Sequence, residues 1–198
     1  MNHGRRVGRG RRPEEEVRQA ALGAATSLLL DEGIAAVTFE RVARLAGVSK
    51  TTLYKWWPSA AAIAVEGYFA VSAPQLELSD SGDIATDLRA QLGQFVDLMT
   101  RSVAGPAVRG LIAAAQSDDD VRRAFVMHYV HPRREIGGAA LRRAQSRGQL
   151  STTIDVQVLI DQLWGACYYR LMTEPDLVTA TYLDALVDQA LNGVAAAR

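Results

Sequence analysis

Apolar residues recur every three or four positions along most of the chain, and this spacing predicts amphipathic helices. In the first such segment, Val17, Ala21, Ala24 and Leu28 fall on one face. Runs of β-branched residues, which would favour strands, are few. The pattern therefore predicts an all-α fold.

Proline, glycine and capping residues divide this pattern into helix-length segments. The first helix should end at Gly33, and Thr38 and Ser49 should cap the two short helices that follow. The polar segment 72–82 is a candidate domain boundary. We expect helices over residues 13–32, 39–47, 50–57, 59–72, 83–103, 106–117, 119–147, 155–173 and 177–195. Pro132 predicts a kink or a break inside the segment that contains it.

Charge is distributed unevenly, although the 22 basic and 22 acidic residues cancel. Residues 1–57 hold 10 basic and 6 acidic residues, whereas residues 58–198 hold 12 and 16. Residues 1–12 combine glycine with arginine, including Arg9, Arg11 and Arg12, and should form a disordered basic arm. Two interpretations remain open for this arm: it enters a DNA minor groove, where arginine is favoured, or it is a solubilising tail.

Several classes of protein do not fit the composition. The single cysteine, Cys167, cannot form an internal disulfide or a cysteine-based zinc site, and it favours a cytoplasmic protein. The longest uncharged apolar run, residues 19–30, is too short to span a bilayer, so we expect no membrane partner. Acidic residues follow the arginine-rich N-terminus, and we therefore expect no secretory signal.

Both lysines of the chain, Lys50 and Lys55, lie in the segment SKTTLYKWWPS at residues 49–59. This segment follows a short predicted helix and a Gly-Val-Ser turn, which is typical of a helix-turn-helix motif. The inner face of the motif should consist of Phe39, Val42, Leu45 and Leu53.

The face opposite Leu53 presents cationic and hydroxyl side chains, which suit phosphates and base edges. Its members are Lys50, Thr51, Thr52, Lys55 and Trp56. The second helix of the motif is therefore predicted to recognise DNA. The alternative is a helical hairpin with a solvated, charged face.

The run VTFERVARLAGVSKTTLYKWWPS, residues 37–59, is specific enough to suggest a family. With the helix before it, it resembles the DNA-binding domain of the tetracycline-repressor (TetR) family of bacterial transcription regulators. The resemblance implies three N-terminal helices, a linking fourth helix and a larger helical regulatory domain. It divides the chain into a basic arm (1–12), a DNA-binding domain (13–58) and a ligand-binding and dimerisation domain (59–198).

The resemblance also implies which residues contact DNA. They are Thr38, Ser49, Lys50, Thr51, Thr52, Tyr54, Lys55 and Trp56, with Arg9, Arg11 and Arg12 from the arm. Trp57 matches an aromatic position that packs in the domain core. One departure is Ala60-Ala61, where the family usually has Lys-Glu. The chain therefore lacks a phosphate contact that the arginine arm would have to replace.

A weaker resemblance covers the C-terminal half. VRRAFVMHYVHPRREIGGAALRRAQSRGQL (121–150) and IDQLWGACYYRLM (160–172) are similar to the regulatory domain of one TetR subgroup, which holds a ligand cavity and a dimer interface. The predicted pocket residues are Phe95, Met99, Ile112, Phe125, Met127, His128, Trp164 and Tyr168. Apolar walls with few polar groups favour an apolar or aromatic effector, whereas the alternative assigns these residues to an ordinary core.

Other residues do not support catalysis or metal binding. His128 and His131 lack a third ligand at convincing spacing, and Cys167 has no neighbouring base and lies in an apolar stripe. We therefore predict no enzymatic activity and no cofactor. The last two helices carry apolar stripes, through Leu163 in one and Leu186 in the other, which could form a four-helix bundle with a second copy.

These features together predict a homodimeric DNA-binding regulator. Two recognition helices would bind a palindromic site in double-stranded DNA. A small-molecule effector would release a repressor of this kind from its operator. The alternative is a DNA-binding regulator that has no small-molecule effector.

Overall fold

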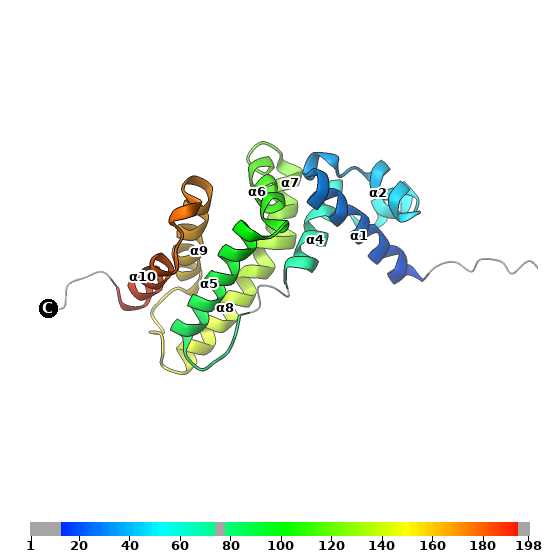
Figure 1. The fold of residues 1–198 in the computed structure, drawn as a ribbon. Helices are drawn as coiled ribbons and strands as arrows, with labels where there is room; N and C mark the ends of the chain where they lie inside the picture. The colour runs from blue at the N-terminus through cyan, green and yellow to red at the C-terminus, as the bar shows by residue number, and fades with distance from the viewer. Residues whose placement is uncertain (1–12, 74–77, 194–198) are drawn as a thin grey trace, which may run out of the picture.

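The computed structural model describes residues 13–73 and 78–193, and within these ranges the chain is helical and contains no strand (Figure 1). The all-α prediction is confirmed, and the expected helices appear with bounds shifted by only a few residues. No described helix is long and apolar enough to cross a bilayer. The α-helices are α1 (Glu14–Glu32), α2 (Phe39–Ala46), α3 (Lys50–Trp56), α4 (Ala60–Ser72), α5 (Ile84–Arg101), α6 (Ala104–Ala114), α7 (Asp119–Phe125), α8 (His131–Ser146), α9 (Val156–Thr173) and α10 (Ala180–Asn192).

The N-terminal helices pack around α1. Its inner face contacts α2 and α4 and buries Ala21, Leu22, Ala25, Leu28 and Leu29. Gly67 of α4 allows the two longest helices of this group to approach closely, because a Cβ at Gly67 would collide with the Thr26 Oγ1 on α1. The result is a compact support for the two short helices α2 and α3.

α4 joins the N-terminal helices to the rest of the chain. One face packs on α1, and another packs on α7 and on the turn Val126–Val130 that follows α7. Tyr68 of α4 is fully buried, and its ring centroid lies 5.5 Å from that of Tyr129. The hydrophobic core is therefore continuous from the N-terminal helices into the C-terminal ones.

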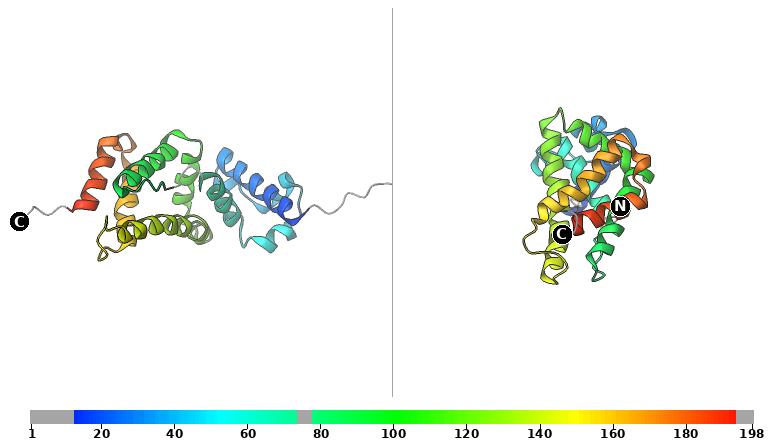
Figure 2. Two further views of the ribbon diagram at one scale, coloured as in Figure 1. Left: turned by 90° about the horizontal axis from the view of Figure 1, so that it is seen from below. Right: turned by 90° about the vertical axis from the view of Figure 1, so that its left-hand side faces the viewer.

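The C-terminal helices assemble around α5. This helix contacts α6, α9 and α10, and it buries Leu88, Leu92, Phe95 and Met99. α8 packs along α9 on the other side of the pocket described below. Figures 1 and 2 show an elongated molecule with α1–α3 at one end and α9 and α10 at the other.

The expected kink or break at Pro132 takes the form of a π turn. α7 continues through Val126–Val130 directly into α8, and the His131 N–H donates to the Val126 carbonyl. Proline has no N–H, and its ring clashes with the preceding turn of a regular α-helix. A wider i→i+5 turn relieves both problems, so the helix continues past Pro132 instead of ending.

The apolar stripes of α9 and α10 lie largely against the interior of this chain, and the four-helix bundle with a second copy stays a prediction. Leu163 and Cys167 of α9 and Val187 of α10 are fully buried, and Leu186 is partly buried. α9 also has an exposed face on its opposite side, which carries Tyr169 at 70% exposure. Periodicity identified the stripes but could not tell which neighbour would cover them.

Candidate DNA-binding surface and ligand pocket

Local hydrogen bonds set the angle between α2 and α3. The Thr38 side chain accepts the Arg41 N–H at 3.3 Å at the start of α2, and the Ser49 side chain accepts the Thr52 N–H at 3.1 Å at the start of α3. Between the helices, Gly47 has φ 67°, in the left-handed region that favours glycine. These caps and the glycine turn produce the helix-turn-helix.

The two faces of α3 have opposite character. Leu53 is fully buried, as expected, whereas Lys50, Thr51, Tyr54 and Lys55 are exposed. Thr52 and Trp56 are partly buried at the edge of this face. The Tyr54 ring packs edge-on against Phe39 of α2, with centroids 4.5 Å apart, although Tyr54 is 62% exposed. α3 thus presents a continuous cationic and hydroxyl surface.

The two lysines on this surface are in different electrostatic states. Lys50 Nζ lies 2.6 Å from Glu40 Oε1 on α2, and both side chains are exposed. The hydrogen bond lowers the pKa of Glu40 and raises that of Lys50. Lys55 forms no ion pair with any acid in the described part of the chain, so its charge is available to a ligand such as phosphate.

The end of α3 is anchored to α1 and α4. Trp57 is only 2% exposed, and its Nε1–H donates to Glu66 Oε2 at 2.6 Å. Glu66 also pairs with Arg18 of α1, whose guanidinium lies 5.4 Å from the Trp57 ring centroid. Trp57 therefore packs in the core, as the resemblance implied. The neighbouring Trp56 donates to Glu14 Oε1 at 3.2 Å.

One expectation for the motif is wrong, and one set of residues remains untested. Leu45 is 57% exposed and does not belong to the inner face of α2, which consists of Phe39, Val42, Ala43 and Ala46. Helical periodicity alone does not separate Leu45 from Ala43 and Ala46. The turn at Gly47 sets the direction of α3, and this direction decides which side chains of α2 become buried. Arg9, Arg11 and Arg12 lie outside the described residues.

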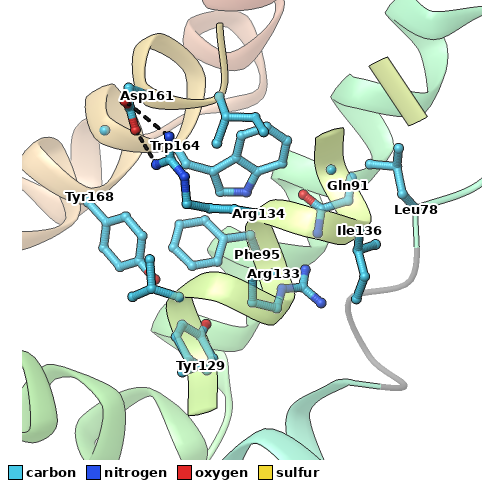
Figure 3. Close-up of a pocket in the computed structure, with 14 residues that line it drawn as sticks. Leu78, Gln91, Phe95, Tyr129, Arg133, Arg134, Ile136, Asp161, Trp164 and Tyr168 are labelled. Atoms are coloured by element: carbon cyan, nitrogen blue, oxygen red, sulfur yellow. Dashed lines mark hydrogen bonds and ion pairs between the residues drawn. The ribbon is translucent and has the colours of Figure 1, made fainter. Parts of the chain in front are cut away.

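A pocket of about 190 Å³ lies between α5, the π turn, α8 and α9 (Figure 3). Its walls are mainly apolar and aromatic, and Figure 3 shows Phe95, Trp164 and Tyr168 directed toward the same space. The Phe95 and Tyr168 rings pack edge-on, with centroids 4.8 Å apart. Such walls suit the apolar body of a small molecule.

Few polar groups reach this pocket. Arg134 forms an ion pair with Asp161 at the rim, and its Nε donates to Gln157 Oε1 at 2.8 Å. The Tyr129 and Tyr168 hydroxyl groups interact, and burial raises the pKa of both phenols, so both are neutral hydrogen-bonding groups. Arg133 and Gln91 complete the polar lining.

Three of the predicted ligand residues line the pocket, namely Phe95, Trp164 and Tyr168. The other five do not line it, and their assignment is corrected accordingly: Met99, Ile112, Phe125, Met127 and His128. Met99 is buried in the core and Met127 is 60% exposed. Because a π turn holds about one more residue than an α turn, Tyr129 rather than Met127 or His128 faces the pocket.

Comparisons with known proteins agree with this architecture. Residues 21–73 match the family described as bacterial regulatory proteins of the tetR family, and residues 78–190 match the tetracyclin repressor-like C-terminal domain. The chain belongs to the TetR family of transcriptional regulators. TetR-family proteins are DNA-binding regulators without enzymatic activity, and the helix-turn-helix of α2 and α3 is the part that defines them.

Relatives of the chain within the TetR family cover nearly its whole length. An uncharacterized HTH-type regulator of Bacillus subtilis, YdeS, is 33% identical over 95% of this chain and 94% of its own. A DNA-binding transcriptional repressor of Mycobacteroides abscessus, TetR, is 32% identical over 89% and 93%. The crystal structure of the TetR family regulator SCO0332 is 48% identical, with a TM-score of 0.81 over 91% of this chain and 100% of that one.

Within this TetR fold, sequence reasoning missed Tyr129 and Arg133, two polar residues of the pocket. Both occur in the helical segment that contains Pro132, four positions apart, so they share a face of a regular helix. The His-Pro-Arg-Arg step could have drawn attention to Arg133, because consecutive arginines beside aromatic residues are unusual on an inner face. Its orientation, however, depends on the π turn, which periodicity does not predict.

Proposed function

We propose that this TetR-family protein is a homodimeric transcriptional repressor in the cytoplasm, and that a small molecule in the pocket releases it from a palindromic operator. One observation supports this proposal most strongly. Tyr129 lines the pocket and also contacts Tyr68 of α4, and α4 packs on α1 beneath the helix-turn-helix. A ligand that moves Tyr129 therefore acts on the helix that positions the DNA-binding surface.

DNA binding is assigned to the exposed side of α3 and the start of α2. Lys55 and Tyr54 project from a rigid motif, because Leu53 and Trp57 hold α3 against the core. The full proposed set is Thr38, Ser49, Lys50, Thr51, Thr52, Tyr54, Lys55 and Trp56, with the arm residues Arg9, Arg11 and Arg12 as additional phosphate contacts. We assign residues 13–58 to DNA binding and residues 59–198 to ligand binding and dimerisation.

Dimerisation is assigned to the exposed face of α9. Val158, Tyr169 and Met172 on this face are 52%, 70% and 42% exposed and recur at helical spacing. Exposed aromatic and methionine side chains are enriched in interfaces. One short recognition helix makes few base contacts, whereas a two-fold dimer doubles them on adjacent half-sites.

Release requires the ligand to favour a state that fits DNA less well. Its effect on DNA affinity cannot exceed its differential affinity for the two states. Tyr68 and Tyr129 form a buried contact, and α4 packs closely on α1 at Gly67. These contacts couple the position of the pocket wall to the position of the helix-turn-helix. A shift of α4 would change the separation of the two α3 helices in the dimer, and hence the half-site spacing that they match. The 32% identity to a protein named as a repressor supports this direction of regulation.

Selection of duplex DNA from a random pool tests the proposal. The expected product is an inverted repeat whose half-sites lie about one helical turn, roughly 10 base pairs, apart or a multiple of it. A compound screen against the protein bound to that DNA should then yield ligands that dissociate the complex. Enrichment of a single half-site would contradict the dimeric assignment. DNA binding that no pocket ligand changes would favour a regulator without an effector.

A further inference from the structure

The pocket contains a positive charge that the described chain does not neutralise. Arg133, on α8, lines the pocket, and its Nη1 is buried with no hydrogen-bond partner among residues 13–73 and 78–193. No aspartate or glutamate in these ranges forms an ion pair with it. Arg133 as a whole is only partly buried, but a buried donor without a partner destabilises the empty protein.

The adjacent arginine shows how different this arrangement is. Arg134 pairs with Asp161 and also bonds to Gln157, so its charge is compensated within the chain. Both arginines line the same pocket, but only Arg134 has an acidic partner among the described residues. Buried charged groups in proteins are usually paired. Arg133 instead turns an uncompensated guanidinium toward the cavity (Figure 3).

The surroundings of Arg133 are polar but uncharged. Burial lowers its pKa, and the nearest titratable groups are the phenols of Tyr129, Tyr168 and Tyr68. Burial raises the pKa of all three phenols, so they remain protonated donors at neutral pH. Guanidinium stays protonated in proteins. The site therefore combines the unpaired charge of Arg133 with neutral hydroxyl groups and the internally paired Arg134 and Asp161, in a wall that is otherwise mainly apolar.

We propose that the effector is a small organic anion, an aromatic or short aliphatic carboxylate, whose carboxylate is bound by Arg133. This inference rests on the proposed function and names the chemical class of its ligand. A planar carboxylate accepts two parallel N–H bonds from guanidinium. Phe95 and Trp164 provide walls for the apolar body. A cavity of about 150 Å³ holds benzene, so the pocket of about 190 Å³ has room for a ring and a carboxylate.

Charge balance favours a carboxylate over a phosphate ester. Phosphate monoesters carry about −1.5 to −2 charges at pH 7, whereas Arg133 supplies a single compensating charge. Arg134 cannot supply the second one without losing Asp161, whose carboxylate lines the same pocket and repels a dianion. One guanidinium and one carboxylate leave the filled pocket neutral.

Calorimetric titration of the DNA-free protein tests this inference with matched pairs of probes. Benzoate and phenylacetate are compared with benzamide and phenylacetamide, which have the same shape and no charge. We expect each acid to bind about ten- to a hundred-fold more tightly than its amide, as for a hydrogen bond to a charged group. Amides that bind as tightly as the acids, or acids that fail to bind at millimolar concentration, would overturn the inference.

Variants then assign the preference to one side chain. Arg133→Met should abolish the preference for acids, and Arg133→Lys should retain part of it. Arg142→Met, on the same helix and outside the pocket, should leave the preference unchanged. If Arg133→Met does not fold, the Arg133→Lys variant and the wild-type comparison of acids with amides still test whether Arg133 binds the carboxylate. An unaltered preference in a folded Arg133→Met protein contradicts the assignment.

One variant tests whether a residue outside the described ranges already neutralises Arg133. Glu77 precedes the pocket residue Leu78 and lies outside the described residues. Glu77→Gln should leave acid binding unchanged. A tenfold or greater increase in affinity for the acids would show that Glu77 already neutralises Arg133, which overturns the inference.

Two results separate this inference from the proposed function. Acids that bind without releasing operator DNA would leave the anion site standing but contradict its role as the effector site. Neutral compounds that bind the pocket and release DNA, when acids neither bind nor release it, would support the proposed function and refute the anion site.

Discussion

The ring of Tyr129 in the pocket wall lies 5.5 Å from the ring of Tyr68 on α4, and the two side chains connect the pocket to the helix beneath the helix-turn-helix. Phe69, the next residue of α4, approaches Tyr129 edge-on at 6.3 Å. Phe125 stacks behind Tyr129 at 5.0 Å, so this ring is held on both sides. The proposed release mechanism requires a ligand to displace Tyr129, because this ring contacts α4.

Tyr68→Phe should stabilise the protein. The Tyr68 hydroxyl is buried and has no hydrogen-bond partner among the described residues, and an unsatisfied buried polar group costs about 1–3 kcal/mol. Its removal should raise the free energy of unfolding, measured by urea denaturation, by about 1 kcal/mol. Tyr54→Phe is the matched control, because Tyr54 is 62% exposed and lies outside the assigned dimer interface. A clear loss of stability in Tyr68→Phe would show that the hydroxyl has a partner.

Glu66→Ala should weaken the link between α3 and the rest of the protein. It removes the acceptor of the Trp57 indole N–H and the partner of Arg18 together. The expected loss of unfolding free energy is about 2–3 kcal/mol, because the Trp57 donor remains buried and unpaired. A double-mutant cycle with Trp57→Phe isolates the hydrogen bond. Additive effects of the two substitutions would contradict a direct interaction.

Much of the fold could be predicted from the sequence because its signals are local. The caps Thr38 and Ser49 and the turn glycine Gly47 depend only on neighbours in the chain, and the structure has the helix-turn-helix where they indicated it. The face of α3 followed from Leu53, since a seven-residue helix has a single buried side. The recognition surface thus needed no information about the rest of the molecule.

The pocket could be predicted only in part, because its residues depend on long-range packing. Phe95 and Trp164 line it, but Met127 does not, since the π turn before Pro132 shifts the side chains of that segment. Arg133 was overlooked because arginine residues are mostly exposed on protein surfaces. The stripes of α9 and α10 were identified, but whether they face this chain or a partner depends on where α5 packs.

Tyr169→Asp should dissociate the dimer. Tyr169 is 70% exposed on the outer face of α9, and burial of an unpaired carboxylate at its position opposes association. Sedimentation at micromolar concentration should show a dimer for the wild-type protein and a monomer for the variant. Val103→Asp, at a 78% exposed apolar position between α5 and α6, should remain dimeric. A monomeric wild-type protein, or a dimeric Tyr169→Asp, would refute the α9 interface.

Cys167 should be inert toward thiol reagents in the folded protein. It is fully buried, and burial raises its pKa to about 12, whereas an exposed cysteine has a pKa of about 8.5. Because the thiolate is the reactive form, alkylation at pH 8 should be at least about a hundredfold slower in buffer than in urea. Equal rates in buffer and urea would show that the helices around α9 open readily.

DNA binding by the exposed face of α3 is tested most directly by the salt dependence of operator affinity in Lys55→Ala. Lys55 is exposed on α3 and forms no ion pair with a described acid, so its removal should leave the fold intact. If Lys55 contacts a phosphate, the variant should bind more weakly and the slope of log K against log salt should fall by about 1. Arg101→Ala, on α5 and outside the assigned DNA-binding surface, is the control and should match the wild-type protein. Wild-type affinity and an unchanged slope in Lys55→Ala would contradict the assignment of this face to DNA.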